Sequence, residues 1–269
     1  MITTVLMGGL GNQLFQLFNL MAYAETHRQE FFLEDVPPQR EDRPFYWDTF
    51  LAPLRKYLKT PDMLPVYQEP RFEHDPILPY AQIKQPFKFF GYFQSYRYFQ
   101  KHEALLFERI KLKETLAKTR TVYPFKFDDF ISMHFRVGDY KHLQEHHPVL
   151  PFSYYTSALN VMMRMTTART VLYFYEAEDK DHVDDYISRL KPLFPQMIFV
   201  SIDHTDPDHV QLSLMACCSH QIIANSTFSW WGAYFNENKE KIVTYPSKWF
   251  GPAQAKDTVD LFPTTWIKI

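Results

Sequence analysis

The chain has 269 residues, a net charge of −2 at pH 7 and a hydrophobic content of 46%. This length suits two ordinary domains or one large one, and the composition excludes a disordered chain. Because acidic and basic residues nearly balance, no charge excess is present to neutralise phosphates, and we expect no nucleic-acid partner. Glycine is scarce, with 7 residues, so each glycine cluster marks a place where the backbone needs it.

The cysteines and the N-terminal sequence indicate the compartment. Cys217 and Cys218 are adjacent, and adjacent cysteines rarely form a disulfide with each other. We therefore expect no disulfide framework and a cytoplasmic, reducing environment. The sequence shows no signal-peptide pattern and no run approaching the roughly 18 apolar residues of a transmembrane segment.

The first half of the chain begins with a predicted strand, a glycine turn and a helix. Residues 3–7 are apolar and partly β-branched, and apolar positions recur at helical spacing over 12–27. Residues 36–80 are rich in proline and predict loops and short helices. The other elements expected in this half are a strand over 31–33, a strand over 88–93, a helix over 95–106 and a hinge near 110–127.

The second half alternates between predicted strands and helices. The expected strands cover 130–135, 170–175, 197–201, 221–224 and 241–244. The expected helices cover 154–165, 181–190, 208–217 and 229–235. This alternation predicts parallel βαβ units in a doubly wound sheet. Ligands bind at the carboxyl ends of strands in such sheets, so the residues after each strand are the candidates for function.

Two candidate anion sites start helices. Gly8-Gly9-Leu10-Gly11-Asn12-Gln13 follows the first strand, and backbone N–H groups at a helix start suit phosphate. The segment is an incomplete dinucleotide fingerprint and lacks the lysine of a Walker loop, so a plain strand–helix turn is the alternative. Asn225-Ser226-Thr227 follows a later strand and offers N-cap hydroxyls at a positive helix end, with capping alone as the alternative.

Arg136 follows the strand over 130–135. The two-residue period of a strand places His134 and Arg136 on the same side, and the planar fork of an arginine suits a pyrophosphate. A structural ion pair with Asp139 is the alternative. For Val137 we expect a side chain that turns into the cleft, because Gly138 marks a turn already under way.

Carboxylates follow the strand over 170–175, in Glu176-Ala177-Glu178-Asp179. A carboxylate here could accept hydrogen bonds from a nucleobase or a ribose. Asp179-x-Asp181 and Asp206-x-Asp208 match a short pattern that can hold a divalent metal, but two-residue matches arise often by chance. The histidines lack a zinc spacing, and we expect no metal and no cofactor.

Several motifs occur in order along the chain, and together they resemble the α-1,2-fucosyltransferases of glycosyltransferase family 11. The main ones are Gly8-Gly9-Leu10-Gly11-Asn12-Gln13-Leu14-Phe15-Gln16, His134-x-Arg136-x-Gly138-Asp139-Tyr140 and Asn225-Ser226-Thr227-Phe228-Ser229-Trp230-Trp231-Gly232-Ala233. Supporting matches are Gly91-Tyr92-x-Gln94-Ser95-x-x-Tyr98-Phe99, Pro246-x-Lys248-Trp249-Phe250 and Pro263-x-x-Trp266. Val137 stands where the family usually has a second arginine, and Glu176-Ala177-Glu178-Asp179 replaces its usual Phe-Ser-Asp-Asp.

The resemblance implies a GT-B-like α/β fold, with two Rossmann-type lobes and a cleft between them. We divide the chain into an acceptor-side lobe over 1–120 and a nucleotide-sugar lobe over 121–269. The implied reaction moves L-fucose from GDP-fucose to a galactose 2-hydroxyl of a glycan, with inversion and without a required metal. The alternatives are a transferase for another nucleotide sugar, a metal-dependent transferase using Asp179-x-Asp181, and an inactive nucleotide-sugar-binding module.

The residues expected at the site fall into three groups. For catalysis they are Arg136, which would hold the leaving diphosphate, and Asp139 and His134 as candidate bases, with His27, Glu145 and His147 outside the motif. For donor binding they are Gly9, Gly11, Asn12, Glu178, Asn225, Ser226, Thr227 and Phe228. For acceptor binding they are Tyr92 and Gln94, in a segment where the aromatic rings of Tyr92 and Phe93 could stack on a sugar.

Overall fold

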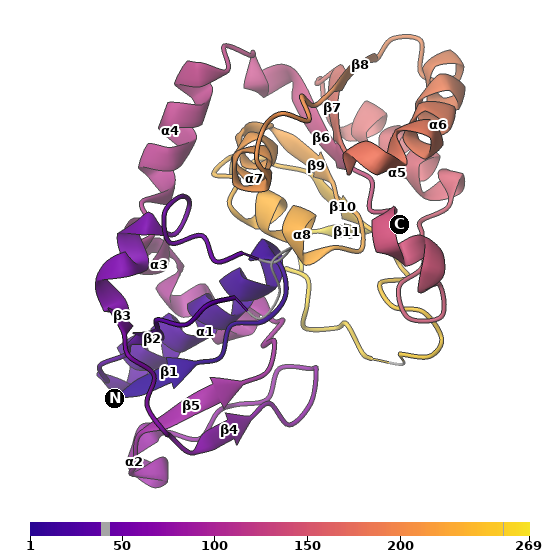
Figure 1. The fold of residues 1–269 in the computed structure, drawn as a ribbon. Coiled ribbons are helices and arrows are strands. Elements are labelled where there is room, and N and C mark those ends of the chain that lie inside the picture. Colours follow the sequence, from indigo (N-terminus) through magenta and orange to yellow (C-terminus); the bar gives the residue numbers. More distant parts are fainter. Residues whose placement is uncertain (39–43, 255) are drawn as a thin grey trace. The chain divides into compact units, whose positions relative to one another are not determined.

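The computed structural model describes residues 1–38, 44–254 and 256–269. It consists of parallel strands joined by helices and loops (Figure 1). The chain divides into two units. Unit 1 contains Met1–Thr115 and Lys256–Pro263, and unit 2 contains Leu116–Ala255 and Thr264–Ile269. Among the described residues, no helix combines the length and the apolar character that crossing a bilayer demands.

Unit 1 is built on short parallel strands. One sheet has the order β1-β5-β4, β2 pairs with β3, and a single bridge joins Ile2 to Phe31. The elements are β1 Ile2–Thr4, α1 Leu10–His27, β2 Leu33–Glu34, β3 Leu58–Lys59, β4 Val66–Gln68, α2 Tyr80–Ile83, β5 Phe87–Phe90 and α3 Glu103–Arg109. Helix α4, Leu112–Val122, runs across the boundary between the two units in the sequence.

A late segment of the chain returns to unit 1. The Ser95 hydroxyl donates to the Asp260 carbonyl at 2.7 Å, and Arg97 pairs with the Asp260 carboxylate at 2.5 Å. We expected two continuous lobes that divide at residue 120. The two units are instead discontinuous in sequence, because residues 256–263 pack with the N-terminal part of the chain.

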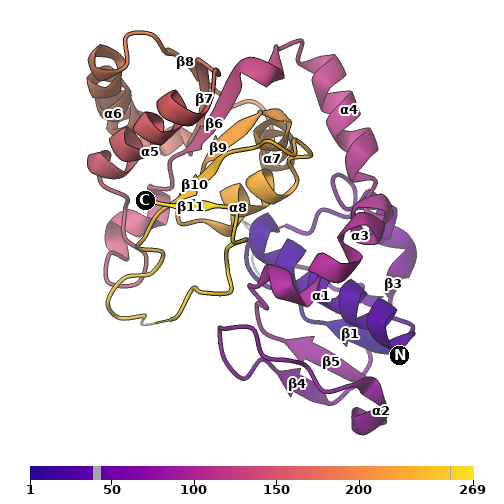
Figure 2. The ribbon, with the colours of Figure 1, turned by 180° about the vertical axis from the view of Figure 1, so that it is seen from behind.

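Unit 2 contains a six-stranded parallel sheet with the order β11-β10-β9-β6-β7-β8. Its elements are β6 Phe130–His134, α5 Phe152–Met165, β7 Thr170–Phe174, α6 Lys180–Leu193, β8 Ile198–Ser201, α7 Asp208–Cys217, β9 His220–Ile222, α8 Thr227–Tyr234, β10 Val243–Tyr245 and β11 Ile267–Lys268. Helices α5 and α6 cover one face of the sheet and α7 and α8 the other (Figures 1 and 2). The doubly wound parallel sheet expected for this half is confirmed.

Several expected elements take a different form. The hinge predicted near 110–127 is largely helix α4, whose buried residues Leu112, Leu116 and Thr119 recur at helical spacing between polar residues. The helix predicted over 95–106 is two 3-10 turns followed by α3, after a strand that ends at Phe90. Strands β3, β4 and β11 were not predicted, because strands of two or three residues depend on their pairing partners. Residues 39–43 of the proline-rich stretch lie outside the described residues.

The alternation of side chains along β6 decides where Val137 lies. Ile131, Met133, Phe135 and Val137 all belong to the core that β6 and β7 form with α5 and α6, and Val137 is 2% exposed. Pairing continues past the last strand residue, since the Phe135 N–H donates to the Phe174 carbonyl at 2.8 Å. The expectation that Val137 turns into a cleft is therefore wrong: the two-residue period extends to it and points it away from the side of Arg136.

We expect Val137→Arg to unfold or strongly destabilise the protein, because it places a charge within a cluster of buried hydrophobic side chains. The free energy of unfolding should fall by about 3–5 kcal/mol, the cost of an uncompensated buried charge. Val122→Arg is the matched control, because Val122 is 59% exposed, and its effect should stay within about 0.5 kcal/mol. Urea denaturation of both variants measures the difference; equal stabilities would contradict the core position of Val137.

Candidate functional site

The strand order of unit 2 places a switch point between β6 and β9. In chain order β6, β7 and β8 extend to one side, and β9, β10 and β11 extend to the other. Ligands of doubly wound sheets bind outside the carboxyl ends of the strands where the order reverses. The segments after β6 and β9 contain Arg136 and Asn225-Ser226-Thr227, so the topology brings two of the predicted segments to one edge of the sheet.

Arg136 lies within a set of charged and aromatic side chains. One terminal nitrogen, Nη2, donates to Asp139 at 2.6 Å, and the other, Nη1, donates to Glu176, which follows β7. The guanidinium carbon lies 5.0 Å from the centre of the Tyr140 ring, and the Arg136 side chain is only 16% exposed. The ion pair with Asp139 that we considered as the alternative is therefore present, together with a second one to Glu176.

The charged groups around Arg136 shift one another's pKa. Burial lowers the pKa of Arg136, but Glu176, Tyr140 and Asp139 outweigh it, so the net pKa is raised. Burial raises the pKa of Glu176, Arg136 opposes this, and the nearby carboxylates of Glu178, Asp179 and Asp139 raise it further. Arg136 therefore stays charged, and Glu176 is a carboxylate whose ionised form depends on Arg136.

Asp179 holds the loop that carries Arg136. Its side chain is fully buried, and it accepts from the Gly138 N–H at 2.6 Å and from the Lys141 ammonium at 2.8 Å. Gly138 has a φ of +24°, and a Cβ there would lie 2.3 Å from a carboxylate oxygen of Glu176. A side chain at this φ would be strained and would also push the Glu176 carboxylate away, which explains glycine at this motif position.

The start of α8 forms the second part of the site. The Ser226 hydroxyl caps the helix by accepting from the Phe228 N–H at 3.3 Å, and Thr227 is the first helical residue. The Asn225 amide donates to the carbonyls of Pro148 at 2.9 Å and Trp249 at 3.3 Å. The Tyr140 hydroxyl donates to the Asn225 carbonyl at 3.2 Å, so this turn is joined to the Arg136 loop.

His134 is buried beside this turn. Its ring lies 5.9 Å from that of Phe228, and burial together with the Arg136 charge lowers its pKa to about 3. The ring is therefore neutral near pH 7 and a weak proton acceptor. Two buried polar atoms here, His134 Nδ1 and Asn225 Oδ1, have no hydrogen-bond partner among the residues that the structure describes.

The predicted residues of unit 1 lie around the glycine turn and the end of β5. Gly9 is the N-cap of α1, Gly11 lies buried in its first turn, and the Gln94 amide donates to the Asn12 side-chain oxygen at 3.0 Å. Tyr92 is 38% exposed. Asn12 and Gln94, predicted for the donor and the acceptor respectively, are therefore direct neighbours.

A carboxylate that the sequence reasoning missed holds this loop of unit 1. The two oxygens of Glu69 accept from the Tyr92 N–H at 2.7 Å and from the Phe93 N–H at 2.9 Å. Phe93 has a φ of +51°, in the left-handed region that non-glycine residues rarely adopt. Nothing in the sequence around Glu69 signals this role, because the contact joins segments that are distant along the chain.

Of the other predicted residues, His147 contacts the Arg136 loop. Glu178 is exposed on the turn after β7, and the His147 ring stacks on Tyr140 at 4.9 Å. His27 lies in the last turn of α1, with its ring 4.3 Å from that of Tyr23. The Glu145 carbonyl accepts from the Ala253 N–H at 2.8 Å. Among the described residues, no three His, Cys, Asp or Glu side chains gather in a group that could hold a metal ion.

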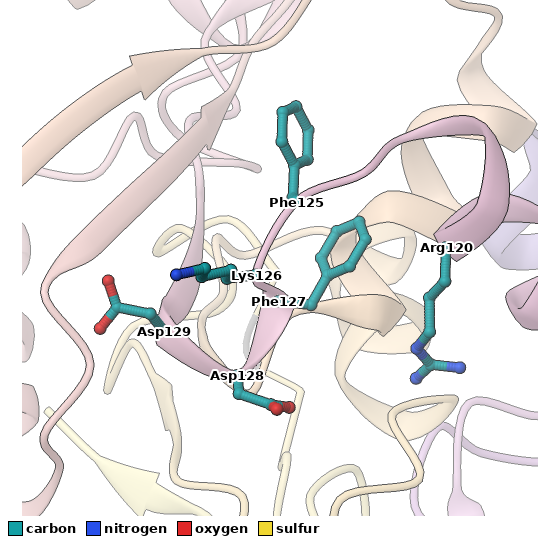
Figure 3. A pocket seen from close by; sticks show the side chains of 6 residues that line it. All are labelled: Arg120, Phe125, Lys126, Phe127, Asp128 and Asp129. Carbon is teal, nitrogen blue, oxygen red and sulfur yellow. The ribbon is translucent and has the colours of Figure 1, made fainter.

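A surface hollow of unit 2 lies away from the switch point. It is lined by Arg120, Phe125, Lys126, Phe127, Asp128 and Asp129 (Figure 3). These residues precede β6, and the Asp129 carboxylate accepts from the Arg169 N–H at 3.0 Å and the Thr170 hydroxyl at 2.8 Å. Asp129 thus joins the amino ends of β6 and β7, the edge of a parallel sheet where ligands are not expected.

Comparisons with known proteins agree with this architecture. A family model described as "Glycosyl transferase family 11" matches residues 1–269. The O-antigen biosynthesis glycosyltransferase WbnK of Escherichia coli is 28% identical over 198 residues, covering 70% of this chain and 62% of that protein. An α-1,2-colitosyltransferase of Escherichia coli is 25% identical over 195 residues, covering 70% and 64%. The matched part thus spans less than two thirds of either relative.

Solved structures share the fold at low sequence identity. The ADP-heptose lipopolysaccharide heptosyltransferase II of E. coli has a TM-score of 0.54 at 11% identity, covering 100% of this chain and 89% of that one. The NodZ α-1,6-fucosyltransferase soaked with GDP-fucose has a TM-score of 0.50 at 13% identity, covering 86% and 90%. These similarities show that the expected GT-B-like α/β fold is correct.

We expect Asp179→Asn to destabilise unit 2. The two carboxylate oxygens of Asp179 accept from the Gly138 N–H and the Lys141 ammonium, whereas an asparagine has one uncharged oxygen that accepts. The loss should be roughly 1.5–3 kcal/mol, as for hydrogen bonds to a charged group. Asp184→Asn is the control, since Asp184 forms an exposed pair with Lys180, and exposed pairs contribute little to stability. Equal unfolding free energies for the two variants in urea would argue against the role of Asp179.

Proposed function

The chain belongs to glycosyl transferase family 11, and from this premise we propose that it moves a sugar from a nucleoside diphosphate donor to a glycan hydroxyl. The observation that carries the proposal is Arg136, which follows β6 at the switch point of the unit 2 sheet. Its guanidinium lies against the ring of Tyr140, whose hydroxyl donates to the Asn225 carbonyl just before α8. A cation and a helix N-terminus at this edge suit a diphosphate. The unpartnered His134 Nδ1 and Asn225 Oδ1 are further polar groups that a donor could satisfy.

We propose GDP-fucose as the donor, a galactose 2-hydroxyl as the acceptor and inversion at the anomeric carbon. The support is the set of motifs shared with α-1,2-fucosyltransferases. The relative named α-1,2-colitosyltransferase favours a second candidate, the same linkage with colitose as the sugar. Thermal shift with a panel of nucleotide sugars separates the two, because a ligand that binds the native state raises its stability.

The proposed chemistry needs a stabilised leaving group and a proton acceptor. As the bond from the sugar to the phosphate oxygen breaks, charge grows on the diphosphate, and Arg136 and the N–H groups at the start of α8 would balance it. Between His134 and Asp139, we propose Asp139 as the base. Its side chain is 51% exposed, whereas His134 is buried with a pKa lowered to about 3.

We also propose that the protein acts in the cytoplasm. Its two cysteines, Cys217 and Cys218, are free and buried, which agrees with a reducing environment.

Arg136→Ala should cost about 2–4 kcal/mol of transition-state stabilisation, which is measured as the fall in kcat/KM for the donor. Arg136→Lys should restore little, because one ammonium cannot replace a two-pronged guanidinium. Arg189→Ala serves as the control, since Arg189 pairs with Asp185 at an exposed position of α6. A near-normal kcat/KM in Arg136→Ala would exclude this role. If the parent binds GDP-fucose but neither transfers the sugar nor slowly hydrolyses GDP-fucose, the protein is an inactive binding module.

Transfer activity should persist in EDTA. In the pattern Asp179-x-Asp181, both oxygens of Asp179 already accept hydrogen bonds, from the Gly138 N–H and the Lys141 ammonium. A metal ion would therefore have to rely on Asp181. Initial rates with and without the chelator, followed by added Mg²⁺ or Mn²⁺, test this. Loss of activity in EDTA with recovery on addition of metal would contradict it.

A further inference from the structure

We infer that Glu176 is a resident counter-ion of Arg136 that a diphosphate must displace, so that this carboxylate weakens the binding of anions at the switch point. The inference rests on the proposed function, which supplies the diphosphate. It assigns to Glu176 a positioning role that acts through Arg136.

Both terminal nitrogens of Arg136 are occupied in the structure. Nη1 donates to Glu176 Oε1 and Nη2 donates to Asp139 Oδ1. The ring of Tyr140 lies 5.0 Å from the guanidinium carbon, and 16% of the Arg136 side chain is exposed. Other N–H groups of the guanidinium remain, but the side chain is mostly covered and the two carboxylates already stand at its terminal nitrogens. We therefore expect an incoming diphosphate to replace at least one carboxylate rather than add to both.

Glu176 is the carboxylate that we expect to leave. Asp139 lies three residues from Arg136 on the same loop, whereas Glu176 comes from the turn after β7 and reaches across to the guanidinium. The missing side chain of Gly138 makes room for it, because a Cβ at that position would lie 2.3 Å from Glu176 Oε2. The glycine of the motif therefore serves the resident counter-ion as well as the turn.

The charges near Glu176 favour its release once another anion reaches Arg136. Burial raises the pKa of Glu176, and the nearby carboxylates of Glu178, Asp179 and Asp139 raise it further. Arg136 is the group that favours its ionised form. A diphosphate would therefore compete with a carboxylate that is held by a single cation among like charges.

The test compares Glu176→Gln with the parent for two probes, GDP and inorganic pyrophosphate, by titration calorimetry. Glutamine keeps the shape of the side chain and removes its charge. We expect Kd to fall about tenfold for both probes, because an uncharged amide competes less well for the guanidinium. Pyrophosphate lacks the ribose and the base, so an equal effect on both probes places the change at the phosphates.

The control is Asp185→Asn on α6. Asp185 is an exposed carboxylate that also pairs with an arginine, Arg189, so this variant makes the same change in net charge away from Arg136. Its affinity for both probes should stay close to that of the parent. The thermal unfolding midpoint of each variant shows whether it is folded.

The outcomes distinguish this inference from the proposed function. Unchanged or weaker binding in folded Glu176→Gln, beside measurable binding by the parent, would overturn the inference alone. An equal gain in Asp185→Asn would overturn it too, since net charge would then explain the effect. Binding of neither probe by the parent or by Glu176→Gln would overturn the phosphate site itself, and the inference with it.

Discussion

The ion pairs of Arg136 are the interaction on which the candidate site of unit 2 depends. A guanidinium that is 16% exposed requires partners, and Glu176 and Asp139 supply them from the ends of two neighbouring strands. Asp179 then anchors the same loop through the Gly138 N–H and Lys141. The loop thus carries its cation in a defined place, and the proposed recognition of a diphosphate needs such a place in advance of binding.

Unit 1 holds its own strand–helix turn by a similar use of buried polar side chains. The Gln16 side chain accepts from the Met7 N–H at 2.9 Å and donates to the Met7 carbonyl at 3.3 Å, and the Gln13 amide donates to the Gly8 carbonyl at 3.0 Å. The backbone of the glycine turn is thereby satisfied within the protein. In both units a short motif forms a turn after a strand. Glutamines of the motif itself hold the turn in unit 1, whereas Asp179 from a distant segment holds the turn in unit 2.

The sequence predicted most of the second half well, because its helices and its longer strands, such as β6 and β7, show their own period. The helix over 208–217 and the strand that begins at Phe130 occur as predicted. Short strands such as β3 and β11 carry no period and form only through pairing. Val137 was misplaced because a glycine was read as the end of the alternation, whereas packing against α5 and α6 extends it.

Sequence alone determined the family resemblance and the placement of Arg136 and Asn225-Ser226-Thr227 directly after strands, since these depend on local motifs and on the order of elements. Tertiary structure decided the partners. That Glu176 rather than Glu178 pairs with Arg136, that Asp179 is bound to the Gly138 N–H, and that Glu69 holds the Tyr92 loop are contacts between distant segments. A carboxylate looks the same in any sequence, and only the register of neighbouring strands and the turns after them determines which one reaches a given cation.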